Sequence, residues 1–133
     1  MIAVLDTSAL IRFYIPDGPL PDGMETFMAE LDRGVSTALV PSLIWVEAAS
    51  VLLKKINRGE LKECEAFELM CLWRNLPLKE IETSESILEI LKLAYHENLS
   101  SYDATYLYLA IQHHAVLFTA DDLLAKAAQR YRT

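Results

Sequence analysis

The chain has 133 residues, 53% of them hydrophobic, and a formal net charge of −7 at pH 7. This length predicts a single domain over 1–133 that buries roughly 70% of the surface of its unfolded chain, and the composition argues against disorder. The negative charge argues against a general electrostatic attraction to nucleic acid, although it leaves room for a local contact.

The apolar stretches of the chain do not suit a membrane or an export signal. The longest, LVPSLIWVEAASVLL at 39–53, is interrupted by Pro, Ser and Glu, whereas a spanning helix needs about 20 mostly apolar residues in a row. The N-terminal apolar run has no basic segment before it, no cleavage site after it, and too few residues for a signal peptide. We therefore expect a cytoplasmic protein.

Apolar runs separated by turn residues predict strands that alternate with helices. Ser42 and Thr83 are candidate N-caps, and Gly34 and Gly59 mark helix ends. Strands connected through helices form parallel sheets, so we predict an α/β fold with three layers, α/β/α, around a parallel sheet of four or five strands. In chain order the pattern predicts a strand at 2–5, helices at 7–14 and 22–33, a strand at 36–40, helices at 42–57 and 60–76, a strand at 78–81, helices at 83–97 and from 100 or 101 to 113, a strand at 115–119 and a final helix from 121.

The first strand ends on a carboxylate, Asp6, which the hydroxyl residues Thr7 and Ser8 follow. Ligands bind at the C-terminal ends of the strands in open α/β sheets, so this position suits a functional carboxylate. Asp6 also has the position of an N-cap for the next helix. Taken alone, Asp6 fits the two interpretations equally well.

Glu47 interrupts the apolar helical segment LIWVEAASVLL. Its neighbours at helical spacing, such as Leu43 and Val51, do not place it on an obvious polar stripe. A buried ionised carboxylate is costly unless a partner compensates its charge. A cation at a functional site is the partner we favour, while a structural Arg or Lys such as Arg12, or a gap at the surface, is the alternative.

The remaining acids lie at predicted helix starts. Asp103 comes three residues after Ser100, the spacing of a capping box with Asp in place of the usual Glu, and an acid in a first helical turn complements the helix dipole. Asp121 and Asp122 follow the strand at 115–119, and either would make an ordinary N-cap. Taken singly, these acids favour structural roles.

Taken together, the acids predict a metal site. Asp6 and Asp121 follow strands, while Glu47 and Asp103 lie in or near the first turns of helices that leave the same sheet edge, so the four can converge on one crevice. Carboxylates forced together demand protons or cations. Oxygen ligands with few histidines favour Mg²⁺ or Mn²⁺ over zinc. Two such ions, about 3.5–4 Å apart, support phosphodiester hydrolysis.

Four segments resemble those of PIN-domain nucleases: DTSAL at 6–10, Glu47, SSYDATYLYLA at 100–110 and LFTADDLL at 117–124. Each is weak alone, but their order and spacing are fairly specific, and they span almost the entire chain. The small size and simple layout resemble the VapC-type toxins of prokaryotic toxin–antitoxin pairs. The chain stops soon after its last helix, so we expect it to lack a short further strand that family members often carry at that edge.

The resemblance implies a metal-dependent ribonuclease in which a metal-activated water cleaves RNA to leave a 5′-phosphate and a 3′-hydroxyl. It also implies a cognate antitoxin that blocks the acidic crevice with a segment bearing Arg. By position, the catalytic and metal-binding acids would be Asp6, Glu47, Asp103 and Asp121, with Thr7, Ser8 and Thr119 as supporting hydroxyls and Asp122 as an alternate or outer acid.

Two consecutive predicted helices carry large apolar side chains, namely Trp45, Phe67, Leu69, Trp73 and Leu76. Core packing is the default explanation for them. In the toxins, helices of this region bind the antitoxin or a second protomer, and a chain this hydrophobic is able to present an apolar surface to a partner. We therefore predict a homodimer.

The histidines and cysteines have structural explanations. Adjacent His113 and His114 would point about 100° apart on a helix, which makes joint ligation of one metal awkward, so contacts with the helix C-terminus are the safer interpretation. Cys64 and Cys71 are seven residues apart, roughly 10 Å along one helix face, which is too far for a disulfide. We expect them to be buried free thiols.

A basic cluster surrounds one predicted helix end and consists of Lys54, Lys55, Arg58 and Lys62. Most such clusters are solvated surfaces, and a minority contact RNA phosphates or an acidic partner.

Two other functions fit parts of the sequence less well than the nuclease does. The start VLDTS superficially suits an Asp-nucleophile phosphatase of the haloacid dehalogenase type, but that family needs a second Asp two residues after the first, where this chain has Ser8. A non-catalytic regulatory or interaction module would keep the fold without turnover, and the four intact acids argue against it.

Overall fold

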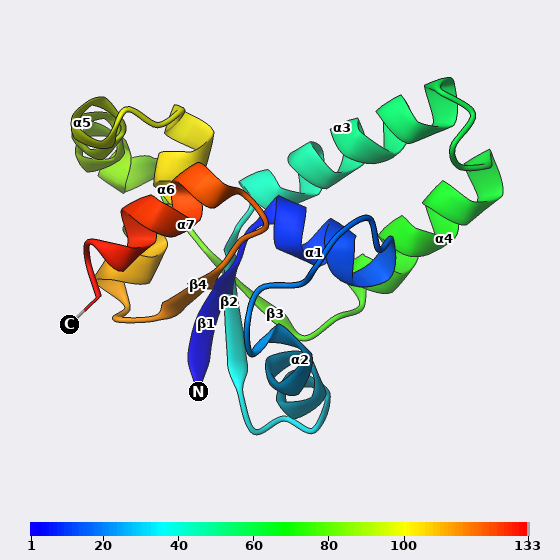
Figure 1. Ribbon diagram of the computed structural model, residues 1–133, viewed down its shortest axis with the longest axis horizontal. Coiled ribbons are helices and arrows are strands. Elements are labelled where there is room, and N and C mark those ends of the chain that lie inside the picture. The colour runs from blue at the N-terminus through cyan, green and yellow to red at the C-terminus, as the bar shows by residue number, and fades with distance from the viewer. Residues whose placement is uncertain (133) are drawn as a thin grey trace.

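The computed structural model describes residues 1–132, and every predicted strand and helix is present in it (Figure 1). Among these residues no helix is long and apolar enough to cross a membrane. The elements are β1 (Ile2–Leu5), α1 (Thr7–Tyr14), α2 (Met24–Asp32), β2 (Thr37–Pro41), α3 (Leu43–Asn57), α4 (Glu63–Arg74), β3 (Leu78–Ile81), the 3₁₀ turn η1 (Ser84–Ser86), α5 (Ile87–Glu97), α6 (Ser101–Gln112), β4 (Val116–Phe118) and α7 (Asp122–Gln129).

The strands form one parallel sheet in the order β3-β2-β1-β4. Ala3 of β1 pairs with Ala38 on one side and Val116 on the other, so β1 is an inner strand and β4 an edge strand. The chain lays β2 and β3 on one side of β1 and then returns to place β4 on the other. The switch point, where α/β sheets bind ligands, therefore lies between β1 and β4.

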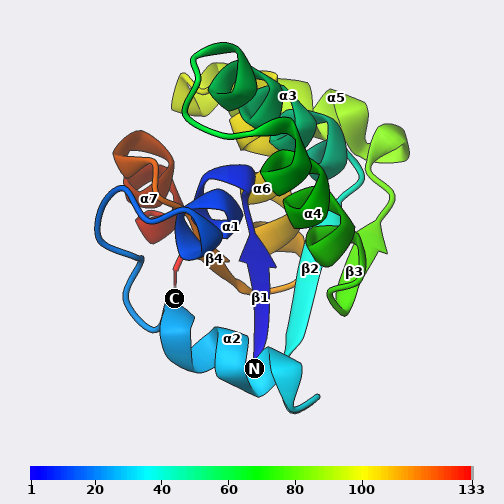
Figure 2. The same cartoon turned by 90° about the vertical axis from the view of Figure 1, so that its right-hand side faces the viewer.

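Helices cover both faces of the sheet, which confirms the predicted α/β/α layers. Figures 1 and 2 show α1, α2 and α4 on one face and α6 and α7 on the other. The strands β1 and β2 are apolar on both faces, as parallel strands between two helical layers must be, and Val4 and Leu39 are buried. The edge strand β3 instead carries the exposed residues Lys79 and Glu80. The paired helices α3 and α4 project beyond the sheet as an arm.

Two predicted helix caps are wrong. Ser42 has the N-cap position of α3 but its backbone is already helical, with φ −59° and ψ −23°, and its side chain makes no capping bond. A capping side chain requires an extended backbone at that position. Before η1 the Glu82 carboxylate accepts hydrogen bonds from the backbone N–H groups of Thr83 and Ser84, so it replaces the predicted Thr83 cap.

The helix α4 differs from its prediction in two ways. It begins at Glu63 rather than at residue 60, because Lys62 is its N-cap residue. Cys64 and Cys71 are free, as predicted, but they are exposed rather than buried. The buried stripe of α4 runs through Ala66 and Trp73, and a residue two positions away points roughly 200° around a helix. The cysteines therefore face away from the core.

Candidate active site

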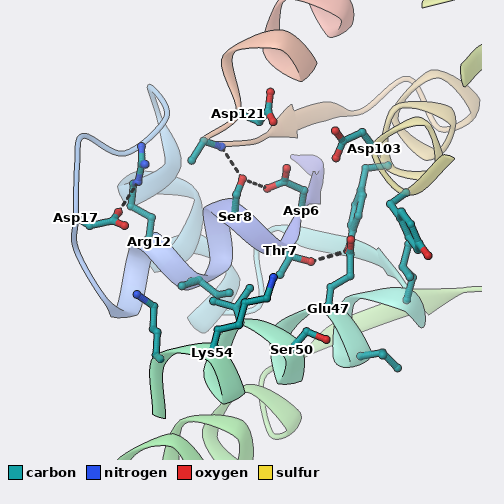
Figure 3. Close-up of a pocket in the computed structure, with 18 residues that line it drawn as sticks. Asp6, Thr7, Ser8, Arg12, Asp17, Glu47, Ser50, Lys54, Asp103 and Asp121 are labelled. Carbon is teal, nitrogen blue, oxygen red and sulfur yellow. Dashed lines mark hydrogen bonds and ion pairs between the residues drawn. The ribbon is translucent and has the colours of Figure 1, made fainter. Parts of the chain in front are cut away.

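The C-terminal ends of β1 and β4 open into a cavity of about 670 Å³. Figure 3 shows side chains of α1, α3, α6 and the turn before α7 gathered around it. Asp122 is exposed at the first position of α7 and does not line the cavity. The structure thus brings together, at the switch point of the sheet, the predicted acids Asp6, Glu47, Asp103 and Asp121 and the hydroxyl residues Thr7 and Ser8.

Asp6 is both the N-cap of α1 and a lining residue of the cavity. Its Oδ1 accepts hydrogen bonds from the Ala9 backbone N–H at 2.9 Å and from Ser8 Oγ at 2.8 Å, and its Oδ2 accepts one from Thr119 Oγ1 at 2.5 Å. The side chain is only 4% exposed. Burial raises its pKa from 3.8 to about 6, against the lowering effect of these donors, and the charge of Asp103 adds to the rise.

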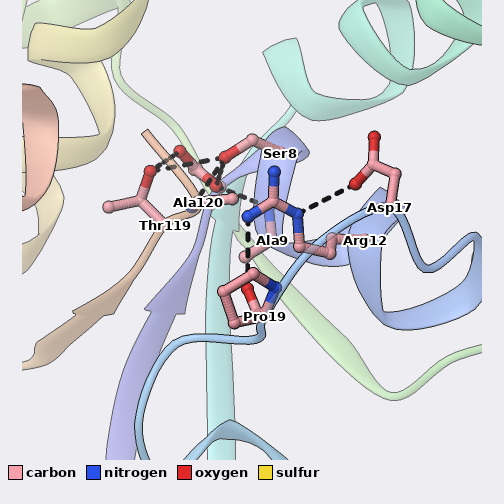
Figure 4. Close-up of polar contacts among 8 residues, drawn as sticks. Ser8, Ala9, Arg12, Asp17, Pro19, Thr119 and Ala120 are labelled. Atoms are coloured by element: carbon pink, nitrogen blue, oxygen red, sulfur yellow. Dashed lines mark hydrogen bonds and ion pairs between the residues drawn. The ribbon is translucent and has the colours of Figure 1, made fainter. Parts of the chain in front are cut away.

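Thr119 links the two strand ends beside the cavity (Figure 4). Besides donating to Asp6, its Oγ1 accepts a hydrogen bond from the backbone N–H of Asp121 at 3.0 Å. Ser8 makes a second link, because its Oγ accepts from the Ala120 N–H at 2.9 Å. Ser8 and Thr119, two of the three predicted supporting hydroxyls, therefore fix the β1–α1 turn against the β4–α7 turn.

Glu47 lies half-buried on α3 and is held by hydroxyl groups rather than by a basic residue. Its Oε1 accepts hydrogen bonds from Thr7 Oγ1 at 2.9 Å and from Tyr106 Oη at 2.6 Å. The structural partner considered for it, Arg12, instead pairs with Asp17. Within residues 1–132 both hydrogen bonds to the Glu47 carboxylate go to Oε1, and the side chain lines the cavity.

Tyr106 is the one residue of this arrangement that sequence reasoning missed. It is 1% exposed, and burial together with the Glu47 hydrogen bond raises the pKa of its hydroxyl, so that it stays a neutral donor. Tyr106 follows Asp103 by three residues on α6, and residues at that spacing share a helix face. That spacing was the available signal, but a tyrosine in a largely apolar helix looks like ordinary core.

Asp103 interacts electrostatically with each of the other three acids of the cavity. It lies half-buried in the first turn of α6, where its backbone N–H donates to Ser100 Oγ at 3.1 Å, as the capping interpretation predicted. Its pKa is raised by burial first and then by the charges of Asp121 and Glu47. Since the charge of Asp103 in turn raises the pKa of Asp6, the four acids are electrostatically coupled.

Asp121 is exposed and caps α7. Its Oδ1 accepts hydrogen bonds from the backbone N–H groups of Leu123 at 2.9 Å and Leu124 at 3.1 Å. The N-cap role predicted for this residue is therefore confirmed. The same side chain lines the cavity and adds negative charge to it.

The chemistry of these side chains fits a hard divalent cation, although they do not enclose one as they stand. No three His, Cys, Asp or Glu side chains among residues 1–132 are grouped tightly enough to hold an ion. However, the cavity is lined by four carboxylates, and burial, with a smaller contribution from neighbouring negative charges, raises the pKa values of Asp6 and Asp103. Carboxylate oxygens are the ligands that Mg²⁺ and Mn²⁺ prefer.

The model of the PIN domain family matches residues 3–130. The chain belongs to the PIN domain family. PIN domains are in general nucleases, and PIN-domain nucleases generally use divalent metals. The crystal structure of PAE2754 from Pyrobaculum aerophilum is similar, with a TM-score of 0.74 and 23% identity over 97% of this chain and 89% of that one. At 23% identity, this similarity shows that the two proteins share the same fold and no more than that. No curated protein matched the chain.

Proposed function

We propose that this PIN domain is a Mg²⁺- or Mn²⁺-dependent endoribonuclease that hydrolyses RNA phosphodiesters. One observation carries the proposal. Asp6, Glu47, Asp103 and Asp121 come from four separate places in the chain and line one cavity at the switch point of the sheet. A purely structural origin explains Asp6 and Asp121 as caps, but it does not explain why Glu47 and Asp103 face the same cavity.

A divalent cation bound there would polarise the phosphate and lower the pKa of an attacking water. The residues of the chain prepare the carboxylates for it. Three donors hold Asp6 in a single orientation, and Thr7 and Tyr106 hold Glu47 through one oxygen only. Preorganised ligands of this kind lose little conformational freedom when they bind an ion.

The proposed biological role is that of a VapC-type toxin, active as a homodimer and blocked by an antitoxin. Exposed apolar side chains on the α3–α4 arm support a protein partner. Phe67 is 62% exposed, whereas Trp73, which also belongs to the predicted apolar surface, is fully buried. Light scattering on the purified chain tests this part: Phe67→Ser is expected to reduce a dimer to a monomer, and a monomeric wild type contradicts the homodimer.

Cleavage of RNA with Mn²⁺ present tests the proposed activity. Wild type is expected to cut, while Asp6→Asn and Asp103→Asn remove charge from the centre of the cavity and are expected to be inactive. Asp122→Asn is the matched control, because Asp122 is an exposed neighbour outside the cavity. Variants of Asp6 and Asp103 that cut as fast as wild type would overturn the proposal.

Two further measurements separate the biological role from the rival function. Growth arrest on expression, relieved by Asp6→Asn or Asp103→Asn, would support the toxin role. A wild type that neither binds Mn²⁺ nor cuts RNA would instead favour a non-catalytic interaction module.

A further inference from the structure

The cavity that holds the acids has a basic end. Arg12 on α1 and Lys54 and Lys55 on α3 line it opposite the carboxylates, as Figure 3 shows for Arg12 and Lys54. We propose that Arg12 and Lys54 form a subsite for a backbone phosphate of single-stranded RNA, next to the phosphate that is cleaved. This inference rests on the proposed ribonuclease function and names how its substrate is held.

Arg12 is fixed in place before any ligand binds. Its Nε donates to Asp17 Oδ1 at 3.0 Å and its Nη1 donates to the Pro19 carbonyl at 3.1 Å (Figure 4). Gly18 closes the turn against the guanidinium, because a Cβ at that position would lie 3.2 Å from Arg12 Cζ. The 17–19 turn therefore orients the guanidinium at little further entropic cost to binding.

The fixed guanidinium keeps donors to spare. An arginine carries five N–H donors, and acceptors among residues 1–132 take two of those of Arg12. An ion pair that only tied the turn to α1 would not need to line the cavity, yet Arg12 does so beside Lys54. Phosphate is the anion that a planar, multiply donating guanidinium binds well.

The charges at the two ends of the cavity do not neutralise each other. Lys55 pairs with Glu60 at 3.5 Å and Arg12 with Asp17. In the described part of the chain, Lys54 forms no ion pair, and none joins the basic end to the four acids. A nucleic acid strand satisfies both ends at once, because a phosphate with its metal counter-ions suits the acids and the neighbouring phosphate suits the basic side chains.

Binding of a fluorescein-labelled, unstructured single-stranded RNA, measured by anisotropy in EDTA so that no cleavage occurs, tests the subsite. We expect Arg12→Ala and Lys54→Ala each to weaken binding about tenfold or more. Each is also expected to reduce the slope of log affinity against log salt by about 0.7, the value for one phosphate contact on a single strand. Arg12→Lys should restore the slope but only part of the affinity, because it keeps the charge and loses the planar donors.

Arg33→Ala is the matched control, since Arg33 is exposed at the C-cap of α2, before β2 and away from the cavity. Its affinity and salt slope should equal those of wild type. Lys54 is exposed, so Lys54→Ala should fold even if removal of Arg12 disturbs the turn.

Wild-type affinity and salt slope in both Arg12→Ala and Lys54→Ala would overturn the subsite. If wild type cuts RNA in that case, the ribonuclease proposal stands without it. A wild type that neither binds nor cuts RNA would overturn both proposals together.

Discussion

Asp6 and Asp121 are both N-caps of helices that follow parallel strands, but they differ in environment. Each follows a parallel strand and caps the helix that comes next. Asp6 lies at the end of the inner strand β1 and is 4% exposed, whereas Asp121 follows the edge strand β4 and is exposed. The same local motif therefore gives a solvated cap at the sheet edge and a desolvated carboxylate inside it.

The difference shows how the fold changes the environment of a capping carboxylate. Burial raises the pKa of Asp6 to about 6, even though three donors oppose the rise. Local sequence is sufficient to make either cap, but only Asp6, at the end of the inner strand β1, is buried.

The largest expected effect is on catalysis. With Mn²⁺ and an RNA oligonucleotide, Asp6→Asn should lower kcat by about 1000-fold or more, because it removes a preorganised charge from the reaction centre. Asp121→Asn should lower it by about 10- to 100-fold, since its Oδ1 already serves the cap. Equal losses, or a larger loss at Asp121, would show that burial does not distinguish the two acids.

The next effect is on stability and depends on pH. The folded state raises the Asp6 pKa from 3.8 to about 6, so the stability that Asp6 contributes is complete below pH 3.8 and is lost as the pH rises through about 6. In EDTA, the free energy of unfolding of Asp6→Asn minus that of wild type should rise by about 3 kcal/mol across this window. Urea unfolding from pH 4 to pH 8 measures it.

Asp121→Ala is the counterpart at the exposed strand end. Its free energy of unfolding should be about 1 kcal/mol lower than that of wild type, because the variant removes an N-cap. A difference between Asp6→Asn and wild type that does not change with pH would rule out a buried, proton-binding Asp6.

Thr119 joins the two strand ends, so its hydroxyl should matter to both. Thr119→Val removes the donor to Asp6 Oδ2 and the acceptor of the Asp121 N–H, and it should destabilise the fold by about 2 kcal/mol at pH 7. The Asp6 pKa should also rise above its wild-type value, which NMR titration of the carboxyl carbon measures. Thr119→Ser should restore both quantities, and a Thr119→Val variant that matches wild type would disprove the link.

The smallest effect concerns the hydroxyls that hold Glu47. Tyr106→Phe removes the donor to Oε1 and should weaken Mn²⁺ binding about tenfold in a calorimetric titration, the loss typical of an outer-shell partner. Tyr108→Phe is the matched control, because on the same helix Tyr108 donates instead to Ser86 Oγ at 3.1 Å. Unchanged Mn²⁺ affinity in Tyr106→Phe would show that the hydroxyl does not orient Glu47 as a ligand.

Local chemistry made most of the fold predictable. The strands β1 and β4 and most of β2 are continuous apolar runs, and Gly34 and Gly59 end helices with φ of +74°, a conformation that glycine adopts without strain. The failures depended on neighbours in space. Ser42 loses its cap to a backbone that is already helical, and the exposure of Cys64 follows from which stripe of α4 meets the core.

The candidate site was predictable to the extent that topology determines it. Parallel strands end at one edge, so acids after β1 and β4 had to lie near each other. The partners of those acids could not be predicted, because they join residues far apart in the chain. Glu47 meets Thr7 and Tyr106 rather than Arg12, and only the packing of α3 against α1 and α6 decides that.

Anomalous diffraction from crystals of wild type and Asp6→Asn, soaked in Mn²⁺ at neutral pH, tests most directly whether the buried carboxylate belongs to a metal site. We predict a Mn²⁺ peak in wild type among Asp6, Glu47, Asp103 and Asp121, and its loss in Asp6→Asn. A wild-type cavity without a peak, or a peak that persists unchanged without the Asp6 charge, would contradict the proposal that Asp6 is a metal ligand.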